Sequence, residues 1–416
     1  MPDSNTGPTY FPEFRNFIES LDSATHEEYS LRHLARVRGV SEFNTMKAHI
    51  LNYYEGVEVP HSFVDSNGQV FDCIPIEQQP ALRDSTVEVA AIPDSPQILS
   101  TGPPRDHQAI PIAGQLRSDR VDKYGHSMRC PPGTIPVRRI TLDELTKWEA
   151  LDQFFSKSPI GRGRHPRLSA DPSIASGVHK YAHAYQGVDN LGGHSFLNVW
   201  DPAVGSQVFS LSQHWYAGGS PVQTAECGWQ VFPAKYNTTQ PVLFIYWTAD
   251  DYKTTGAYNL EGSHFIQTSS SWAIGGTLAA WDSAYGGAQY EIEMQWYLTG
   301  GNWWLYLGGN AVGYYPGSQY GGGQLASSAT NIDYGGEVVD NTSWPPMGSG
   351  SFANAGYSYT AYQRDIEYIS TGGGLVSASL TPQQLSPSCF TISVQMFAAP
   401  WNETIYFGGP GGTGCA

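Results

Sequence analysis

Two glutamates in the second half of the chain stand out as candidates for acid–base chemistry. Glu226 lies in TAECGWQVFP among apolar and small residues, and Glu337 lies in NIDYGGEVVD after two glycines that allow close backbone approach. A carboxyl group in surroundings of low dielectric has a raised pKa. Two facing carboxyls can share one proton, so that one acts as base and the other as acid. From pattern alone, the alternative that each is a surface or ion-paired glutamate stays open.

The other common routes to hydrolysis lack their motifs. The sequence contains no GxSxG elbow and no HExxH pair. His179 and His183 are four apart, but in a segment predicted to be extended they share no helical face. We therefore expect no metal site and no cofactor. Cys227 has no evident histidine base, and a small buried core cysteine is the simpler interpretation.

Further residues could support a carboxylate pair. Gln213, in SLSQHW, is a candidate for orienting water or stabilising an oxyanion, because an amide does both without titrating. A polar residue at a strand end is an equally good interpretation. Four aromatic residues could line a substrate cleft, although core packing would explain them as well: Trp215, Trp229, Tyr246 and Trp247.

The elements around these residues are predicted to be strands. From about Gly177 onward, runs such as VLFIYWTA, YEIEMQWYL, NWWLYLG and FTISVQMF alternate with turns that carry Gly, Asn and Asp. Many strands with short turns are typical of a β-sandwich or a closed barrel, and we predict a mainly β chain with an antiparallel β-sandwich. Within residues 291–298, apolar and polar residues alternate, which predicts a half-buried strand with one wet face.

The first part of the chain is predicted to be a smaller mixed α/β domain. Helical spacing occurs at 45–54 and at 141–155, where Thr141 and Glu144 form a capping box, and short strand-like runs occupy 68–74 and 134–140. Residues 156–172, rich in Gly, Pro, Ser and Arg, resemble an exposed linker of the kind that proteases cleave. We therefore predict domains at 1–155 and 173–416, separated by a linker at 156–172.

Charge restricts the possible partners. The chain has 22 Lys+Arg against 38 Asp+Glu, a net charge of −16, which argues against nucleic acid or an anionic membrane as a partner. Residues 1–166 hold 17 of the 22 basic residues, so the second part is almost free of cations. Such a surface suits work at low pH, where carboxylates are protonated. No run of 18 apolar residues is present, so we expect no membrane span.

At the glutamates and around them the sequence resembles the neprosin family of glutamic peptidases. The pro-region blocks are FDCIPIEQQPAL and CPPGTIPVRR; the later blocks include SLSQHWYAGG, AECGWQV, GNWWLYLG, SATNIDYGGEV, MGSG and FGGPGGTGC. The resemblance covers the chain from about Met46 onward, and it places the family's two catalytic glutamates on Glu226 and Glu337. It also implies cleavage after proline and an N-terminal activation peptide that acts as an inhibitor.

The cysteines partly follow the family pattern. Cys389 and Cys415 match a C-terminal bridge of the family, and Cys73 and Cys130 are expected to pair within the pro-region, which leaves Cys227 free. A cysteine pair usual in the family is replaced here by Ala257 and Glu261.

These observations predict a secreted zymogen of an acid-acting endopeptidase, although the start, MPDSNTGPTYFPEF, does not have the features of a signal peptide. We expect residues 1 to about 160 to occupy the cleft at neutral pH, with arginines between Arg117 and Arg139 pairing with carboxylates of the β-domain. Acid would weaken that clamp, and the linker would then be cut. Two alternatives remain: a non-catalytic carbohydrate-binding β-sandwich and a two-carboxylate glycoside hydrolase.

Overall fold

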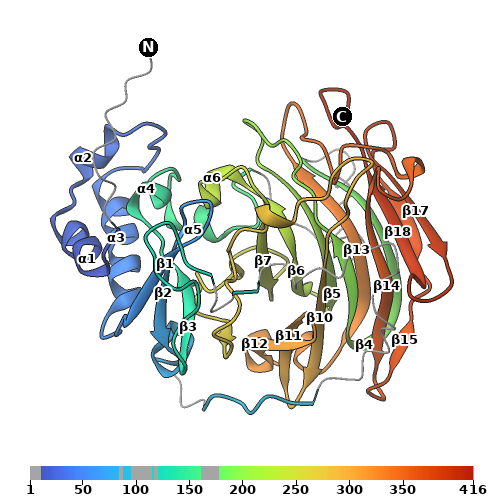
Figure 1. Cartoon of the computed structure of the whole chain (residues 1–416), viewed down its shortest axis with the longest axis horizontal. Helices are drawn as coiled ribbons and strands as arrows, with labels where there is room; N and C mark the ends of the chain where they lie inside the picture. The colour runs from blue at the N-terminus through green and yellow to red at the C-terminus, as the bar shows by residue number, and fades with distance from the viewer. Residues whose placement is uncertain (1–10, 84–87, 95–114, 117–119, 161–177, 416) are drawn as a thin grey trace.

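The computed structural model describes residues 11–83, 88–94, 115–116, 120–160 and 178–415. The part of the predicted linker from 161 to 172 lies outside the described residues. Two regions are evident in Figure 1: helices with a small sheet, in blue and turquoise, and a much larger stack of strands from green to red. The predicted mainly β fold with a smaller mixed region ahead of it is confirmed.

The N-terminal region packs helices against a three-stranded antiparallel sheet in the order β1-β2-β3. A disulfide between Cys73 and Cys130 ties β2 to the segment before β3. The elements are α1 (Phe14–Ser23), α2 (His26–Ser30), α3 (Val40–Tyr54), β1 (His61–Val64), β2 (Val70–Pro75), β3 (Thr134–Arg138), α4 (Leu142–Leu145) and α5 (Leu151–Phe155).

The single helix predicted over 141–155 is wrong in extent. The capping box is present, with Thr141 accepting from the Glu144 backbone and Glu144 from the Thr141 backbone, but α4 ends at Leu145. The carbonyl of Thr146 accepts hydrogen bonds from the backbone N–H of Arg36 and Val37 instead of continuing a helix. A tertiary contact with residues 36–38 therefore divides the predicted helix into α4 and α5.

The larger region is one curled antiparallel sheet. Its main path runs β8-β7-β6-β5-β13-β4-β10-β11-β12-β9; β14 and β16 also pair with β4, β15 and β18 pair with β14, and β17 pairs with β18. The strands are β4 (His179–Asn198), β5 (Phe209–Gly218), β6 (Gln223–Val231), β7 (Val242–Thr248), β8 (Ala257–Tyr258), β9 (Ile266–Gln267), β10 (Glu291–Thr299), β11 (Asn302–Leu307), β12 (Asn310–Pro316), β13 (Ala329–Val339), β14 (Ala361–Ser370), β15 (Leu375–Ser377), β16 (Thr381–Gln384), β17 (Thr391–Met396) and β18 (Glu403–Gly408); the short helix α6 (Pro233–Tyr236) follows β6.

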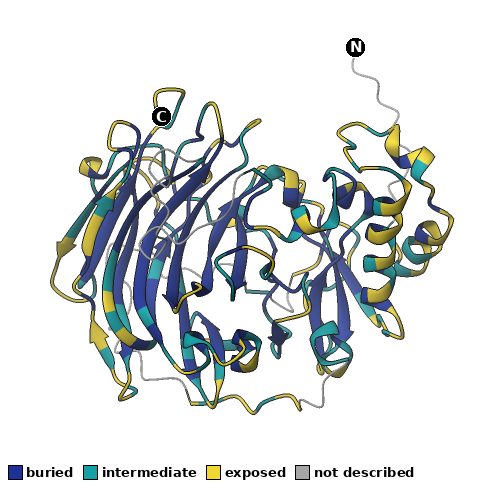
Figure 2. Cartoon of the chain, turned by 180° about the vertical axis from the view of Figure 1, so that it is seen from behind, coloured by how far each residue is buried: buried dark blue, intermediate teal, exposed yellow. Residues whose placement is uncertain are grey.

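The long strand β4 joins the two halves of this sheet. Its first half pairs with β13 and β16, and its second half pairs with β10 and β14. The two halves pack on each other. For example, the ring centre of Tyr216 on β5 lies 6.1 Å from that of Trp303 on β11. Figure 2 shows most of the strands buried, while the outer faces of the N-terminal helices are exposed.

Every residue of β5 and β6 is buried, because both faces of this part of the sheet are covered. One face packs into the core between the two halves, and the other face lies beneath the end of the N-terminal region around residue 157. The second face is therefore covered in part by the N-terminal region, through Lys157, and in part by Tyr252 and Leu385 of the larger region.

The expectation of a wet face on the strand at 291–298 is wrong. In β10, Glu291 and Gln295 are buried and Glu293 is half-buried. Strand β14, which like β10 pairs with the second half of β4, supplies Arg364. Arg364 forms an ion pair with Glu291, so polar partners rather than water meet this face. None of the described helices has the length and apolar character needed to cross a membrane.

Candidate active site

The two predicted glutamates lie on one face of the sheet, on strands that flank β5. Glu226 on β6 stands opposite Trp215, and Glu337 on β13 stands opposite Leu211. Because directly opposite residues share a face, both carboxylates project from the same side of three adjacent strands. Their side chains are 0% and 1% exposed.

Gln213 lies between the two glutamates on β5. Its opposite residues on the two neighbouring strands are both glycine, Gly228 on β6 and Gly335 on β13. No side chain therefore flanks the amide on either strand, which leaves a hollow above Gln213. A Cβ atom on Gly335 would come within 2.3 Å of the carbonyl oxygen of Ala182, so the close strand approach expected there is present.

Glu226 is held by two hydroxyl donors. Thr224 and Tyr252 donate to its Oε1 at 2.8 and 2.7 Å. Burial, and next the Glu226 carboxylate, raise the pKa of Tyr252 well above its ordinary value, so this hydroxyl keeps its proton and donates. The second oxygen, Oε2, is left to face the hollow.

Glu337 is held by an imidazole and an amide. Its Oε1 lies 2.5 Å from Nδ1 of His179, and its Oε2 accepts from Nε2 of Gln213 at 3.2 Å. His183, four residues along β4, instead contacts Asp333 at 2.7 Å. The two histidines thus engage different carboxylates, consistent with the predicted extended segment.

The side chain of Lys157 fills the hollow. Its Nζ lies 2.5 Å from Oε2 of Glu226, 3.0 Å from Oε1 of Gln213 and 3.9 Å from Oε2 of Glu337. The ammonium group also lies 5.2 Å from the centre of the Tyr246 ring. Its main chain is fixed as well, since Tyr258 donates to the carbonyl of Lys157 at 2.8 Å.

The four aromatic residues predicted to line the cleft separate into two groups. Trp215 and Tyr246 stand opposite Glu226 on its two neighbouring strands and therefore share its face. Trp229 shares the face of Cys227, and its Nε1 donates to the carbonyl of Asn198 in the core. The prediction for Trp229 is wrong, because the alternation of β6 points it into the core.

Trp247 contributes from the opposite face of β7. Its ring lies 4.4 Å from that of His264. Together with Tyr246 and Tyr252 it lines a cavity of about 680 Å³, whose other walls include His49 and Phe155 of the N-terminal region. This cavity extends from the surroundings of Glu226 along the boundary between the two regions.

Sequence reasoning did not find four of the residues that complete the site: Lys157, His179, Thr224 and Tyr252. A signal existed for Thr224, because a residue two positions before Glu226 in a strand shares its face. Lys157 falls within the predicted linker, and nothing in its local sequence pattern indicates that its side chain contacts the two glutamates. His179 and Tyr252 come from distant strands and loops.

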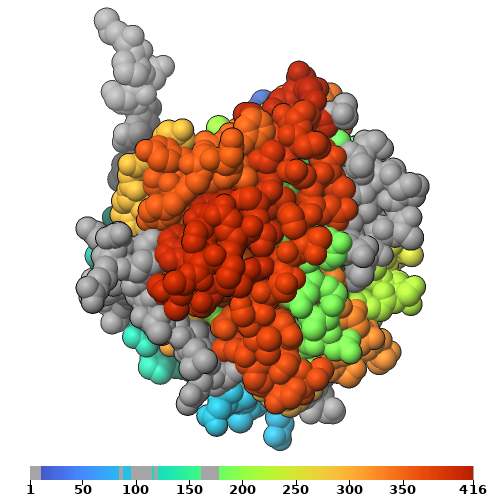
Figure 3. All heavy atoms as spheres, turned by 90° about the vertical axis from the view of Figure 1, so that its right-hand side faces the viewer, coloured from blue at the N-terminus to red at the C-terminus, as the bar shows by residue number. Residues whose placement is uncertain are grey.

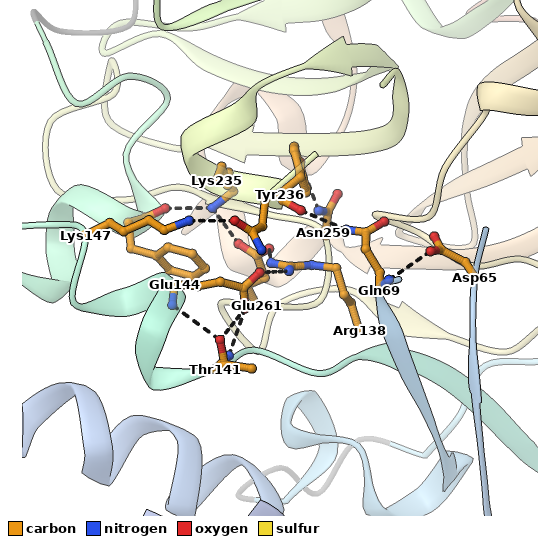
Figure 4. A network of polar contacts seen from close by, with 12 residues as sticks. Asp65, Gln69, Arg138, Thr141, Glu144, Lys147, Lys235, Tyr236, Asn259 and Glu261 are labelled. Carbon is orange, nitrogen blue, oxygen red and sulfur yellow. Dashed lines mark hydrogen bonds and ion pairs between the residues drawn. The ribbon is translucent and has the colours of Figure 1, made fainter. Parts of the chain in front are cut away.

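A second polar network joins the two regions away from the glutamate pair. Arg138 of β3 contacts Glu144 at 2.6 Å and Glu261 at 3.1 Å, and Lys235 of α6 contacts Glu261 at 2.7 Å (Figure 4). All four side chains are at most 9% exposed. Of the predicted arginine contacts to carboxylates of the β-domain, Arg138 with Glu261 is thus present.

Arg139 serves a different purpose. It binds Asp72 within the N-terminal region, so it does not clamp the β-domain as expected.

In the network between the two regions, burial lowers the pKa of Lys235 to about 8, with Glu261 opposing that shift. Glu261, one of the two positions where the chain departs from the family's cysteine pair, is therefore the centre of a buried interdomain ion-pair network.

The cysteines form two disulfides, Cys73–Cys130 and Cys389–Cys415, and leave Cys227 free and buried. The Cys227 thiol lies 2.8 Å from Nε2 of His214. Burial raises the pKa of Cys227 well above its ordinary value and lowers that of His214 to about 3. With these pKa values the thiol and the imidazole are both neutral near pH 7, so this pair is a core contact and not a nucleophile with its base.

The site is therefore a pair of buried glutamates on one face of a β-sheet, contacted there by Lys157 of the chain's own N-terminal region. Two family models match the sequence: Neprosin activation peptide over residues 62–185 and Neprosin over residues 206–410. The chain belongs to the neprosin family, with the activation peptide ahead of the Neprosin region. Family and activation peptide together support a peptidase zymogen.

Similar solved structures include peptidases of low sequence identity. Scytalido-glutamic peptidase with a peptide-based transition state analogue matches at 13% identity and a TM-score of 0.33, over 56% of this chain and 98% of that one. SCP-B, a member of the Eqolisin family in a complex with the tripeptide Ala-Ile-His, matches at 12% identity and 0.31, over 56% and 98%. Similarity at this level carries no argument about the site.

Proposed function

We propose that this chain is the secreted zymogen of an acid-acting glutamic endopeptidase that cleaves polypeptides after proline. The observation that carries the proposal is the common pocket of Glu226, Gln213 and Glu337, in which a single ammonium nitrogen contacts all three. A polar hollow of this kind, emptied of Lys157, is suited to hold a water molecule between two carboxyl groups.

The reaction follows from this arrangement. One glutamate, ionised, takes a proton from water, whose oxygen attacks the scissile carbonyl carbon. The other glutamate, protonated, hydrogen-bonds to the carbonyl oxygen, on which negative charge develops. When the C–N bond breaks, the leaving nitrogen takes a proton from the pair, giving a carboxylic acid and an amine. Gln213 orients the water or the oxyanion without changing its own charge.

The requirement for one shared proton explains why acid should favour activity. The singly protonated pair exists between two macroscopic pKa values, so the rate is expected to be bell-shaped in pH with an acidic optimum.

Preference for proline rests on the family and finds support in the rings beside the pair. Trp215 and Tyr246 flank Glu226 on the same face, and a proline ring packs well against such surfaces. The substrate of the mature enzyme would then be a proline-containing polypeptide.

Latency is the role we propose for the N-terminal region. Lys157 occupies the position that water and the scissile carbonyl need, so the folded zymogen excludes substrate. A cut between 161 and 172, C-terminal to Lys157, would separate this inhibitor from the residues that carry the glutamate pair.

The test compares the full-length chain with Glu226→Gln and Glu337→Gln at pH 3–5 on a denatured proline-rich protein, with mass spectrometry of the products. We expect cleavage after proline by the wild type and a loss of about 10²–10⁴-fold or more in either variant, the usual contribution of acid–base catalysis. Asp189→Asn, an exposed carboxyl on β4, is the matched control and should retain activity.

Cleavage by both glutamine variants at the wild-type rate would refute the assignment of the pair. The two carbohydrate hypotheses predict an intact polypeptide, with sugar release for a glycoside hydrolase and only sugar binding for a lectin. If wild-type protein at pH 4 keeps its full length on a gel while it digests the substrate, the cleavage-activation step is wrong.

A further inference from the structure

A second cluster of ionisable groups lies on the outer face of the sheet, away from the glutamate pair. His194 on β4 stands opposite Glu367 on β14, and its Nε2 lies 2.9 Å from Oε2 of Glu367. Asp365 joins them at a bulge in β14. One ligand atom from each of the three residues lies within 4.8 Å of the others, the one such His/Asp/Glu/Cys group among the described residues.

The cluster is buried. The His194 side chain is 0% exposed, Asp365 is 3% exposed and the Glu367 side chain is 14% exposed. Figure 3 shows that segments of the C-terminal third, in orange and red, form most of the surface on the side of the molecule where β14, β17 and β18 lie in Figure 1. Two carboxylates and an imidazole held this far from water require compensation of their charge.

Unpaired polar atoms on the same face point to a missing occupant. Gln295 of β10 stands directly opposite His194 and is 1% exposed, yet neither its oxygen nor its nitrogen has a hydrogen-bond partner in the described structure. Oε1 of Glu293, also on this face of β10, and Nδ1 of His194 are likewise buried without such a partner. Buried polar atoms are normally satisfied, so four unsatisfied ones around one cluster need an explanation.

The charges around the cluster also indicate a missing cation. Glu293 interacts electrostatically with His194 and Asp365, so a third carboxyl group belongs to this neighbourhood. Arg364, the adjacent cation, is already engaged by both oxygens of Glu291 and by the Pro400 carbonyl.

We propose that His194, Asp365 and Glu367 bind one divalent transition-metal ion of the zinc class, with Glu293 or Gln295 as the fourth ligand. Imidazole nitrogen with carboxylate oxygens is a donor set that zinc accepts, at bond lengths of about 2.0–2.2 Å. Tetrahedral ligands at that distance lie roughly 3.3 Å apart, so the present cluster needs only small movements. The ion would join β4, β10 and β14, and its role is structural.

Several features separate this site from the glutamate pair. Glu337 stands opposite Tyr181 near the start of β4, whereas His194 lies near the end of that strand. The proposed ligands come from two strands, β4 and β14. His194 and Glu367 are 173 positions apart in the sequence, so no local motif marks them.

The test uses the full-length chain at pH 7, treated with chelator, exchanged into zinc-containing buffer and dialysed. We expect about one zinc per chain by elemental analysis, and a melting temperature that rises with zinc. Asp365→Asn and Glu367→Gln should each weaken zinc binding by at least about 10–100-fold, the loss that removal of an outer-shell partner of a ligand already causes. Asp333→Asn is the matched control, because it alters another buried histidine–carboxylate contact, with His183.

A wild-type chain that retains no zinc after dialysis, or variants that bind zinc as tightly as the wild type, would overturn the proposal. Retention of calcium but not zinc, unchanged in His194→Gln, would overturn it too, because the imidazole would have no part. If the variants fail to fold, the wild type still decides the question. Cobalt should bind at the same stoichiometry with a visible spectrum of nitrogen and oxygen ligands, and its absence counts against the site.

Discussion

Lys157 and Glu226 form a buried ion pair, 2.5 Å between Nζ and Oε2, in which an inhibitor and a proposed catalytic group neutralise each other. Neither side chain is more than 2% exposed. Transferring two charges out of water is costly, so such a pair persists only while both partners and their hydrogen bonds are in place. The N-terminal region supplies one partner, which makes latency a property of the contact between the two regions.

Replacing Lys157 should release the site. In Lys157→Met the apolar stem is largely kept and the cation is lost, and removal of one partner of a buried pair costs about 3–5 kcal/mol. We expect self-cleavage on gels to begin closer to neutral pH than in the wild type. Lys123→Gln, at an exposed lysine of the same region, is the control, and identical pH dependence in all three proteins would contradict the role of Lys157.

His179 should position Glu337 without reacting itself. Its Nδ1 lies 2.5 Å from Oε1 of Glu337, so in His179→Gln this carboxyl loses its orientation. We expect kcat to fall by roughly 10²-fold while KM changes little, together with a shifted pH–rate profile. His183 contacts Asp333 instead, so the control variant His183→Gln should leave the pH–rate profile unchanged. A purely structural role would lower stability and leave the profile unchanged.

Glu261 should hold the two regions together. Glu261→Gln leaves Lys235 and Arg138 buried with less negative charge beside them, and breaking a buried network of this kind costs about 3–5 kcal/mol. We expect a lower melting temperature and faster proteolytic release of the N-terminal region. Glu149→Gln removes the exposed pair with Arg38, which is worth about 0–1 kcal/mol. Equal effects from the two substitutions would show that the Glu261 network does not join the regions.

The carboxyl of Asp282 should favour folding increasingly as the pH falls from 7 towards 4. Burial raises the pKa of Asp282 to about 7, and also raises the pKa values of Asp201, Glu293, Asp365 and Glu403. Each of these folded carboxyls then binds more protons than the same group in the unfolded chain, which titrates near pH ~4, so its contribution favours folding on acidification. The buried His214, whose pKa burial lowers to about 3, contributes in the opposite direction. That stabilisation is fully present below the unfolded pKa and is lost as the pH rises through the folded values.

The measurement is the melting temperature of Glu226→Gln at pH 7, 5.5 and 4, since this variant should not digest itself. The additional substitution Asp282→Asn should shift the change in melting temperature on acidification towards destabilisation. An equal change with and without this substitution would contradict the prediction.

Local pattern was sufficient for much of the fold. Alternation and turn residues predicted the strands, and helical spacing predicted α3, because these signals depend on neighbours in the chain. The helix over 141–155 was mispredicted because the backbone N–H groups of Arg36 and Val37 donate to the Thr146 carbonyl. The wet face of β10 was mispredicted because β14 brings Arg364 to it. In both, a distant segment overrode a correct local signal.

Within the site, the sequence by itself indicated which residues could act: Glu226 and Glu337 by their context and the family resemblance, and Gln213 as a candidate amide for water or an oxyanion. Only the tertiary structure decided that they share a face with glycines beside Gln213, that Trp229 turns into the core, and that Lys157 fills the pocket. The reason is physical, because side-chain type and strand alternation are encoded over a few residues. The meeting of β6, β13 and residue 157 depends instead on how the whole sheet and the N-terminal region pack.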